Sequence, residues 1–342
     1  MKCLVVGQGI AGTVLAWKLL QKGVSIQVCD PGFLHQSSAA AAGIINPVTG
    51  KRFVKTWRLD EFFPVARATY QAMESDFGCT LWHEQPIVRL LNSPQEINDW
   101  SARIGTPGYS RVLGERTHAG DWAPFLKPGF HFGEIRQAVR VDFPALTAAF
   151  RHRLQEKHLF TAEQISPEAA GVKASAFDYI IFCEGYRGQQ NAYFPGLAWQ
   201  LAKGEGMLLR IDSPGAETLQ EMIKRDIILV PMGEGIYWVG ASYNWTFEGE
   251  GATAFEQQYL EERLANMLAA PYSVVRRFGA VRPTVKDRRP LLGISPIHPK
   301  MVIFNGLGTK GALLAPYWAN HLAEHLLEGK PLDPEVDIQR FF

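Results

Sequence analysis

Two patterns of hydrophobic and polar positions run along the chain, and each predicts a different kind of element. Short apolar runs predict strands at 2–6, 24–28, 87–91, 177–183, 207–211, 227–230, 236–241 and 301–304. Longer stretches of helical periodicity predict helices at 60–77, 93–104, 143–156, 255–267 and 312–327. Between about 104 and 132 neither pattern holds, so we expect an irregular segment there.

The first thirty residues combine a strand, a glycine-rich turn, a helical pattern and a second strand, in that order. The turn reads Gly7-Gln8-Gly9-Ile10-Ala11-Gly12, and Asp30 follows the second strand. Gly7 suits a tight turn, Gly9 lets the backbone approach a pyrophosphate, and Gly12 allows close helix–strand packing. Unpaired amides at the helix N-terminus would then hold the phosphates, and Asp30 would accept hydrogen bonds from a ribose. This unit predicts a Rossmann-type dinucleotide site, for either NAD or FAD.

A second strand–glycine–helix unit lies near the C-terminus, where Gly306, Gly308 and Gly311 separate the strand at 301–304 from the helix at 312–327. The predicted strands between 207 and 241 lie close together in the chain, which suggests an antiparallel sheet inserted into an α/β protein. We therefore expect an α/β fold with a Rossmann-type domain and an inserted α+β substrate domain that carries the antiparallel sheet.

Composition narrows the possible functions. Thirty-five basic and thirty-four acidic residues leave a net charge of +1, which gives no electrostatic case for binding nucleic acid. The four cysteines show no metal-ligand spacing, and reduced thiols suit a cytoplasmic protein. No segment predicts a membrane span. His321 and His325 share a helix face without a third ligand, so we predict no metal site.

Five blocks of sequence resemble the FAD-dependent D-amino acid oxidase superfamily, and glycine oxidase in particular. They are the fingerprint at 7–12, the serine and alanines at 38–44, and the segments 178–185, 282–293 and 306–316. The last block and the tail at 329–332 are also similar to the flavin domain of the bifunctional tRNA wobble-uridine modification enzyme. The resemblance implies noncovalent FAD, held by a domain of residues 1–80, 138–199 and 279–342. Residues 81–137 and 200–278 would form the substrate domain.

The resemblance also assigns roles to residues. Those expected to bind the cofactor are Gly7, Gly9, Ile10, Ala11, Gly12, Asp30, Ser37, Ser38, Ala42, Gly43, Gly185, Gly306, Gly308, Thr309, Lys310 and Gly311. Arg282 is expected to grip a substrate carboxylate through its planar fork of donors, and Tyr243 to face the substrate. A structural ion pair between Arg282 and Asp287 is the alternative, as is a core-packing role for Tyr243 or a solvated Lys310.

Two departures from the family bear on the substrate and cofactor. Asp30 stands where the family more often has Glu, and Thr309 stands where glycine oxidase has a second arginine. Lys51 and Arg52 follow a Thr-Gly turn and are left without a role.

We expect an oxidoreductase that oxidises the C–N bond of a small amino acid or N-alkylglycine-like amine by hydride transfer to flavin N5, with oxygen or a quinone as electron acceptor. The alternatives are a 2-hydroxy acid dehydrogenase, oxidation of a tRNA wobble-uridine side chain, and a nonenzymatic flavin-binding protein. The oligomeric state is left open.

Overall fold

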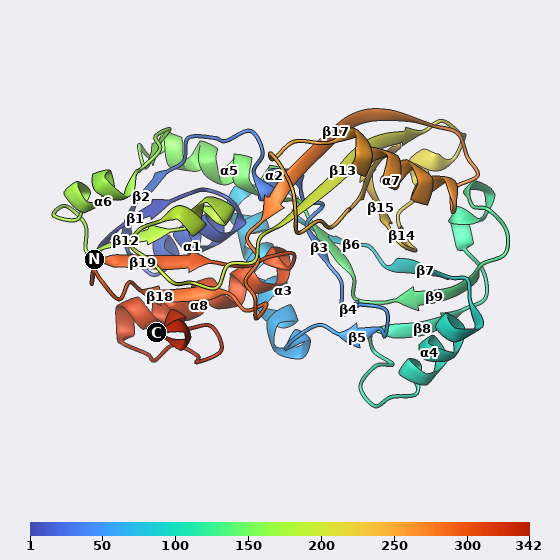
Figure 1. Cartoon of the computed structure of the whole chain (residues 1–342), viewed down its shortest axis with the longest axis horizontal. Helices are drawn as coiled ribbons and strands as arrows, with labels where there is room; N and C mark the ends of the chain where they lie inside the picture. Colours follow the sequence, from blue (N-terminus) through green and yellow to red (C-terminus); the bar gives the residue numbers. More distant parts are fainter.

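The computed structural model describes residues 1–342 and contains two main sheets (Figure 1). The first is six-stranded, in the order β11-β2-β1-β12-β19-β18. Its strands span Phe160–Thr161, Ser25–Cys29, Lys2–Val6, Tyr179–Phe182, Met301–Asn305 and Leu291–Ile294. All its pairings are parallel except that between β18 and β19. This is the Rossmann-type sheet that the terminal motifs predict.

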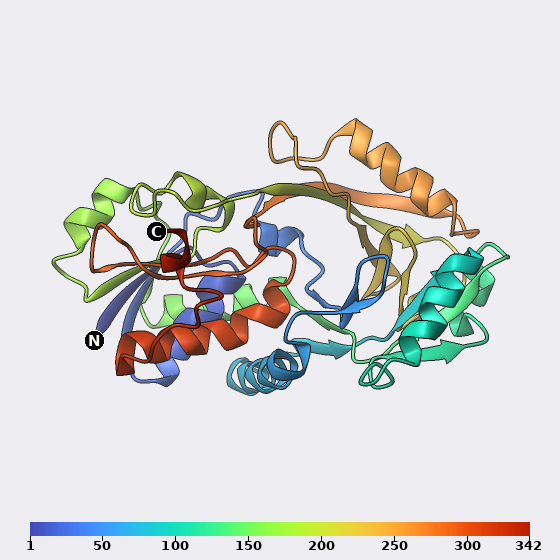
Figure 2. The same ribbon diagram turned by 60° about the horizontal axis from the view of Figure 1, so that its bottom comes forward.

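Both faces of this sheet are covered, as a buried parallel sheet requires. Cys3 and Val5 of β1 belong to the core that includes α1 (Ile10–Gln21) and α8 (Gly311–Glu328). Leu4 and Val6 face the other way, into a smaller core with α6 (Pro167–Lys173) and η4 (Ile338–Phe341). Figure 2 shows α1 and α8 along one side of the sheet.

The second sheet has eight strands in the order β17-β13-β16-β15-β14-β7-β9-β8. These span Tyr272–Arg282, Ala202–Ile211, Ile236–Gly240, Ile228–Gly233, Met222–Lys224, Ile87–Leu91, His131–Ile135 and Leu113–Arg116. Every pairing is antiparallel except β7 with β14. The expected inserted sheet is therefore present.

Two small sheets complete the strands. One has the order β3-β10-β6, with strands Ile44–Ile45, Val139–Val141 and Trp82–Glu84. The other is a hairpin of β4 (Val48–Thr49) and β5 (Val54–Lys55). The remaining helices are α2 (Ser37–Ala40), α3 (Leu59–Phe77), α4 (Pro94–Ile104), α5 (Phe143–Glu156), α7 (Ala254–Ala265), η1 (Gly120–Phe125), η2 (Gly185–Gln190) and η3 (Ala216–Thr218).

Side-chain caps explain why several helices begin where the sequence predicts. Ser93 accepts a hydrogen bond from the amide of Glu96 at the start of α4, and Asp142 accepts one from Ala145 at the start of α5. A proline follows each cap in the first turn, where its missing N–H costs nothing. Both helices end at the residues expected for them.

The expectation of an irregular segment from 104 to 132 was wrong, because β8, η1 and the start of β9 lie within it. The sequence also failed to predict β17, the longest strand. β17 is an edge strand, and its residues 273–277 are exposed on both faces. Such a strand lacks the apolar alternation by which buried strands are recognised.

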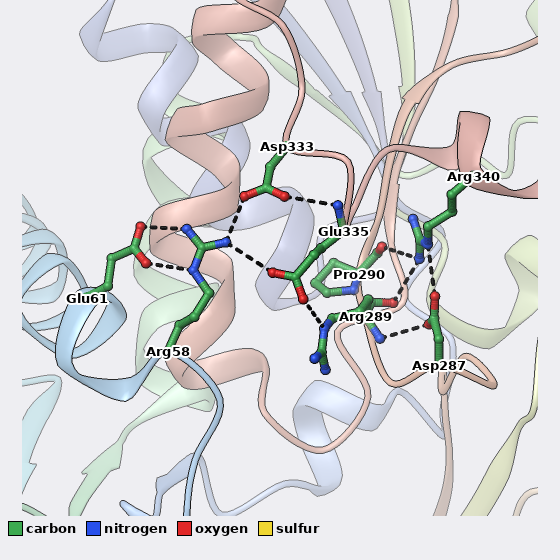
Figure 3. A network of polar contacts seen from close by, with 8 residues as sticks. All are labelled: Arg58, Glu61, Asp287, Arg289, Pro290, Asp333, Glu335 and Arg340. Atoms are coloured by element: carbon green, nitrogen blue, oxygen red, sulfur yellow. Dashed lines mark hydrogen bonds and ion pairs between the residues drawn. The ribbon is translucent and has the colours of Figure 1, made fainter.

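An ion-pair network fastens the C-terminal tail to the rest of the chain (Figure 3). Arg58, at the start of α3, lies 2.6 Å from Glu61 and 2.7 Å from Asp333 of the tail. Arg289 forms an ion pair with Glu335, and Arg340 forms one with Asp287 at 2.8 Å. The tail thereby holds the loop that leads from β17 to β18.

We propose the predicted boundaries as the domain division. Residues 1–80, 138–199 and 279–342 contain all six strands of the first sheet. Residues 81–137 and 200–278 contain the second sheet apart from the last residues of β17. No helix of the structure has the length and apolar character needed to cross a bilayer.

Candidate active site

One large cavity, of about 900 Å³, lies where the two sheets meet. The parallel strands β1, β2, β12 and β19 all end at it, so residues just beyond their carboxyl ends line its wall. In open α/β sheets this edge is where ligands bind. The opposite wall comes from β13, β16 and β17 of the second sheet.

The glycines of the N-terminal turn lie where the fingerprint requires them. A Cβ on Gly12 would stand 1.8 Å from the carbonyl oxygen of Gly7, and one on Gly7 would stand 2.5 Å from that of Cys183. Gly7, Gly9, Ile10 and Ala11 line the cavity, whereas Gly12 packs behind them. The glycines of the turn therefore let its backbone come close to the cavity.

The N-terminus of α1 opens on the cavity. The amide of Ile10 donates to the Ser38 hydroxyl across 2.9 Å, and the amide of Ala11 donates to no protein acceptor. An unpaired amide at the positive end of a helix suits an anionic phosphate. The Ser38 hydroxyl thus accepts the hydrogen bond of the Ile10 amide, a group that the sequence assigns to cofactor binding.

Asp30 is buried at the end of β2 and already accepts four hydrogen bonds. Its Oδ2 accepts from the Gln8 amide at 2.6 Å, and its Oδ1 accepts from the Gly32 amide at 2.7 Å. Gln36 and Arg151 donate to Oδ1 as well. Oδ1 is thus crowded by three donors, whereas Oδ2 accepts a single hydrogen bond and keeps room for a further donor. Asp30 therefore organises the loop around it as well as lining the cavity.

The residues between β2 and β3 also line the cavity. Ser37, Ser38, Ala42 and Gly43 are all in the wall, and the Ser37 hydroxyl donates to the carbonyl of Val281 in β17. Gly43 has a φ of +71°, and a Cβ there would stand 1.9 Å from the carbonyl oxygen of Val141. Gly185, at the start of η2, also lines the cavity in a left-handed conformation.

The second glycine turn places the N-terminus of α8 at the same cavity. Gly308, Thr309 and Gly311 line it, and the amides of Thr309 and Gly311 donate to no protein acceptor. Gly306 instead packs against Val285 and Leu291.

Lys310 lies behind this wall. Its amide donates to the Leu307 carbonyl, so that amide is not free for a cofactor. Burial, reinforced by the nearby Arg289, lowers the pKa of the Lys310 ammonium. The Lys310 side chain is half-buried, in contrast to a fully solvated lysine.

Arg282 ends β17 and lines the cavity together with Phe278 and Ala280, because alternate residues of a strand share a face. Its guanidinium donates to the carbonyl of Lys203 at 3.1 Å and to that of Ser242 at 3.2 Å. Burial lowers the pKa of this group.

Arg282 makes no ion pair with a carboxylate. Asp287, its alternative partner, binds Arg340 and the amide of Arg289 instead. The two carbonyls that accept hydrogen bonds from the half-buried guanidinium are neutral, so they do not balance its positive charge. An anion bound in the cavity would balance it.

Tyr243 lies beside Arg282 but not in the cavity wall. The Arg282 guanidinium is 4.9 Å from the centre of its ring, and its hydroxyl accepts a hydrogen bond from Arg288 at 2.7 Å. The side chain is 43% exposed, so it is not the packed core aromatic of the alternative hypothesis. In this arrangement Tyr243 supports the arginine from outside.

Several cavity residues were not predicted from the sequence. Trp238 and Phe278 form an aromatic wall, with the Trp238 ring nitrogen donating to the Ala40 carbonyl at 2.8 Å. Glu184 lies just after β12, beside the predicted Gly185. The alternation in Ile236–Gly240 could have indicated that Trp238 faces opposite to the core residues Tyr237 and Val239.

The remaining sequence candidates lie away from the cavity. Lys51 and Arg52 are exposed in the β4–β5 hairpin. His321 accepts a hydrogen bond from the Asp333 amide at 2.9 Å, and His325 lies 2.7 Å from the Lys330 carbonyl. These histidines help to hold the tail against α8.

Comparison with known proteins identifies the family. A sequence profile described as "FAD dependent oxidoreductase" matches residues 2–325. The chain is similar to the glycine oxidase of Pseudomonas putida, with 23% identity over 97% of this chain and 96% of that protein. It is also similar to the tRNA 5-methylaminomethyl-2-thiouridine biosynthesis bifunctional protein of Thiobacillus denitrificans, with 24% identity over 98% of this chain and 58% of that protein. The chain spans little more than half the length of two bifunctional relatives that it matches.

Among solved structures, glycine oxidase from Geobacillus kaustophilus matches with a TM-score of 0.77 and 19% identity, over 97% of this chain and 96% of that one. The fold is therefore that of glycine oxidase. The chain belongs to the FAD-dependent oxidoreductase family, and its cofactor is noncovalently bound FAD. The two open helix N-termini and the glycines that bring backbone to the cavity fit this dinucleotide.

Proposed function

We propose that this oxidoreductase acts on the C–N bond of a small amino acid or N-alkylglycine-like amine. The observation that carries the proposal is the Arg282 guanidinium, which faces the cavity without a carboxylate partner. Its planar fork suits a substrate carboxylate, which would accept two parallel hydrogen bonds. The names of the relatives support an amine as the reacting group.

We propose that the two helix N-termini bind different parts of the cofactor. The open amide of Ala11 and the loop around Asp30 would hold the phosphates and ribose. The amides of Thr309 and Gly311 would stabilise negative charge at the other end of the dinucleotide. When bound, FAD supplies a two-electron acceptor at flavin N5.

The residues around Arg282 would orient the substrate and exclude water. Fixing the carboxylate at Arg282 also fixes the neighbouring carbon, whose C–H bond must be presented in one orientation. Trp238 and Phe278 would cover that carbon with an apolar surface. Oxidation removes a hydride equivalent and a proton from the H–C–N–H unit, and water hydrolyses the resulting imine.

A free amino acid is favoured over a tRNA substrate. The Thiobacillus relative is named for tRNA biosynthesis, but 35 basic against 34 acidic residues leave this chain a net charge of only +1, which gives it little net attraction for nucleic acid.

Anaerobic mixing of the holoenzyme with a substrate panel tests the proposal, because reduction bleaches the flavin. We expect fast bleaching by amino acids or N-methylglycines, much slower bleaching by amines without a carboxylate, and none by matched 2-hydroxy acids. Bleaching by hydroxy acids alone, or by no compound of the panel, would overturn the proposal. Reoxidation in air or by a quinone then distinguishes an oxidase from a dehydrogenase.

A further inference from the structure

Four acidic residues line the cavity, and their ionic partners differ. Asp30 accepts from Arg151 and two backbone amides, Glu205 binds Lys203 across 2.9 Å, and Glu250 binds Arg187 across 2.9 Å. Glu184 has no cationic partner: its only hydrogen bond comes from the side-chain amide of Asn191, at 2.8 Å. Glu184 is therefore the one carboxyl of the cavity wall that nothing charged compensates.

The position of Glu184 brings it close to the dinucleotide turn. It follows β12, which pairs with β1 in parallel, so both strands end at the same edge of the sheet. A Cβ on Gly7 would stand 3.3 Å from the Glu184 backbone nitrogen. The backbone of Glu184 thus lies against the turn that holds the phosphates in our account, and Glu184 lines the same cavity.

We propose that Glu184 binds FAD as a neutral carboxylic acid, so that FAD and one proton are held together at this residue. An ionised carboxylate at this place would be repelled by the two phosphates and would lose its remaining water when the cofactor fills the cavity. A protonated carboxyl avoids both costs and offers one O–H donor to the cofactor. The inference does not depend on which substrate is oxidised.

The surroundings of Glu184 are consistent with a neutral acid. Burial raises the pKa of its carboxyl to about 7, more than the hydrogen bond from Asn191 lowers it. The neighbouring Cys183 thiol is buried, which raises its pKa. Burial and the hydrogen bond to Glu250 raise the pKa of Tyr186 to about 12. The charged groups nearby are paired with one another, Arg187 with Glu250 and Arg151 with Asp30.

The proposed protonation makes the affinity for FAD depend on pH. Below about pH 7 the Glu184 proton is already present, so FAD binds without proton uptake. Above it, binding must take up a proton, and the FAD dissociation constant rises by up to tenfold per pH unit until the pKa of the complex is reached.

Calorimetric titration of the apoprotein with FAD tests the inference. At about pH 8, measurements in two buffers of different ionisation enthalpy give the number of protons taken up. We expect uptake approaching one proton for the wild type and none for Glu184→Gln, which keeps the shape but carries no ionisable group. The dissociation constant of Glu184→Gln should also stay flat from about pH 6 to about pH 9.

Glu250→Gln is the matched control, because Glu250 lines the same cavity but is paired with Arg187. It should retain the proton uptake of the wild type. Wild-type protein that binds FAD without proton uptake would overturn the proposal, whatever the variants do. Equal uptake by wild type and Glu184→Gln would assign the proton to another group and overturn it as well.

Discussion

The guanidinium of Arg282 lies directly over Gly204 on the neighbouring strand β13. A Cβ at position 204 would stand 2.0 Å from the Nη2 of Arg282, closer than any two such atoms can approach. The guanidinium can therefore bend back to the carbonyls of Lys203 and Ser242 only because residue 204 has no side chain. Gly204 is in this sense part of the proposed substrate site.

Replacing Gly204 with Ala should displace Arg282 and weaken substrate binding. We expect KM for a carboxylate substrate to rise by about ten- to a hundredfold, since small misplacements of a positioning group have effects of this size. Steady-state kinetics measure it. Gly105→Ala is the control, because Gly105 has a φ of −68° and the nearest atom to its added Cβ is 3.6 Å away, an ordinary contact. Unchanged KM in Gly204→Ala would show that Arg282 does not need its present position.

Asp30→Ala should weaken FAD binding and also destabilise the apoprotein. The loss of a charged acceptor for the ribose is worth about 1.5–3 kcal/mol, or roughly ten- to a hundredfold in the FAD dissociation constant. The melting temperature should fall because the amides of Gln8 and Gly32 lose their acceptor. Quenching of FAD fluorescence and thermal unfolding measure the two effects. If only the melting temperature falls, Asp30 organises its loop without contacting the cofactor.

The network around Arg58 predicts a pH-dependent stability. Arg58→Met should lower the free energy of unfolding by about 1–3 kcal/mol, since it removes charge-assisted bonds to Glu61 and Asp333. The hydrogen bond from Arg58 lowers the pKa of Glu61. Its stabilising effect is therefore present above the unfolded pKa of about 4.3 and is lost as the pH falls below it.

Thermal unfolding of both proteins at neutral and acidic pH measures this difference. The gap between wild type and Arg58→Met should shrink on acidification. Arg67→Met is the control, because the Arg67–Glu84 pair is largely exposed and should contribute little. A gap that is independent of pH would mean that Arg58 stabilises the tail by packing alone.

The sequence predicts the parts of this fold that depend on local rules. The strand–glycine–helix units were found because Gly7 and Gly12 are required by close backbone contacts that any such turn must make. The helices at 93–104 and 143–156 were found from their periodicity, and in the structure the side chains of Ser93 and Asp142 cap them. The edge strand β17 was missed because half of it is exposed.

The features of the site that depend on contacts between distant parts of the chain could not be predicted. The sequence leaves Asp287, five residues away, as an alternative ion-pair partner for Arg282, but in the structure Asp287 binds Arg340 of the tail. Glu184 was not predicted as a site residue. Its lack of a cationic partner becomes evident only when the ion pairs of the other cavity carboxylates are known. Likewise the amide of Lys310 proved to be engaged within its own turn.

The central claim is that Arg282 recognises a carboxylate, and Arg282→Lys tests it most directly. Lysine keeps the positive charge but replaces the planar fork with a freely rotating point charge, so orientation is lost while attraction remains. The measurement is the rate of anaerobic flavin reduction by a carboxylate substrate and by the matched amine that lacks the carboxylate. We predict that the variant retains FAD and slows by about a hundredfold with the carboxylate substrate, but changes little with the amine. An equal loss with both compounds, or no loss with either, would contradict carboxylate recognition by Arg282.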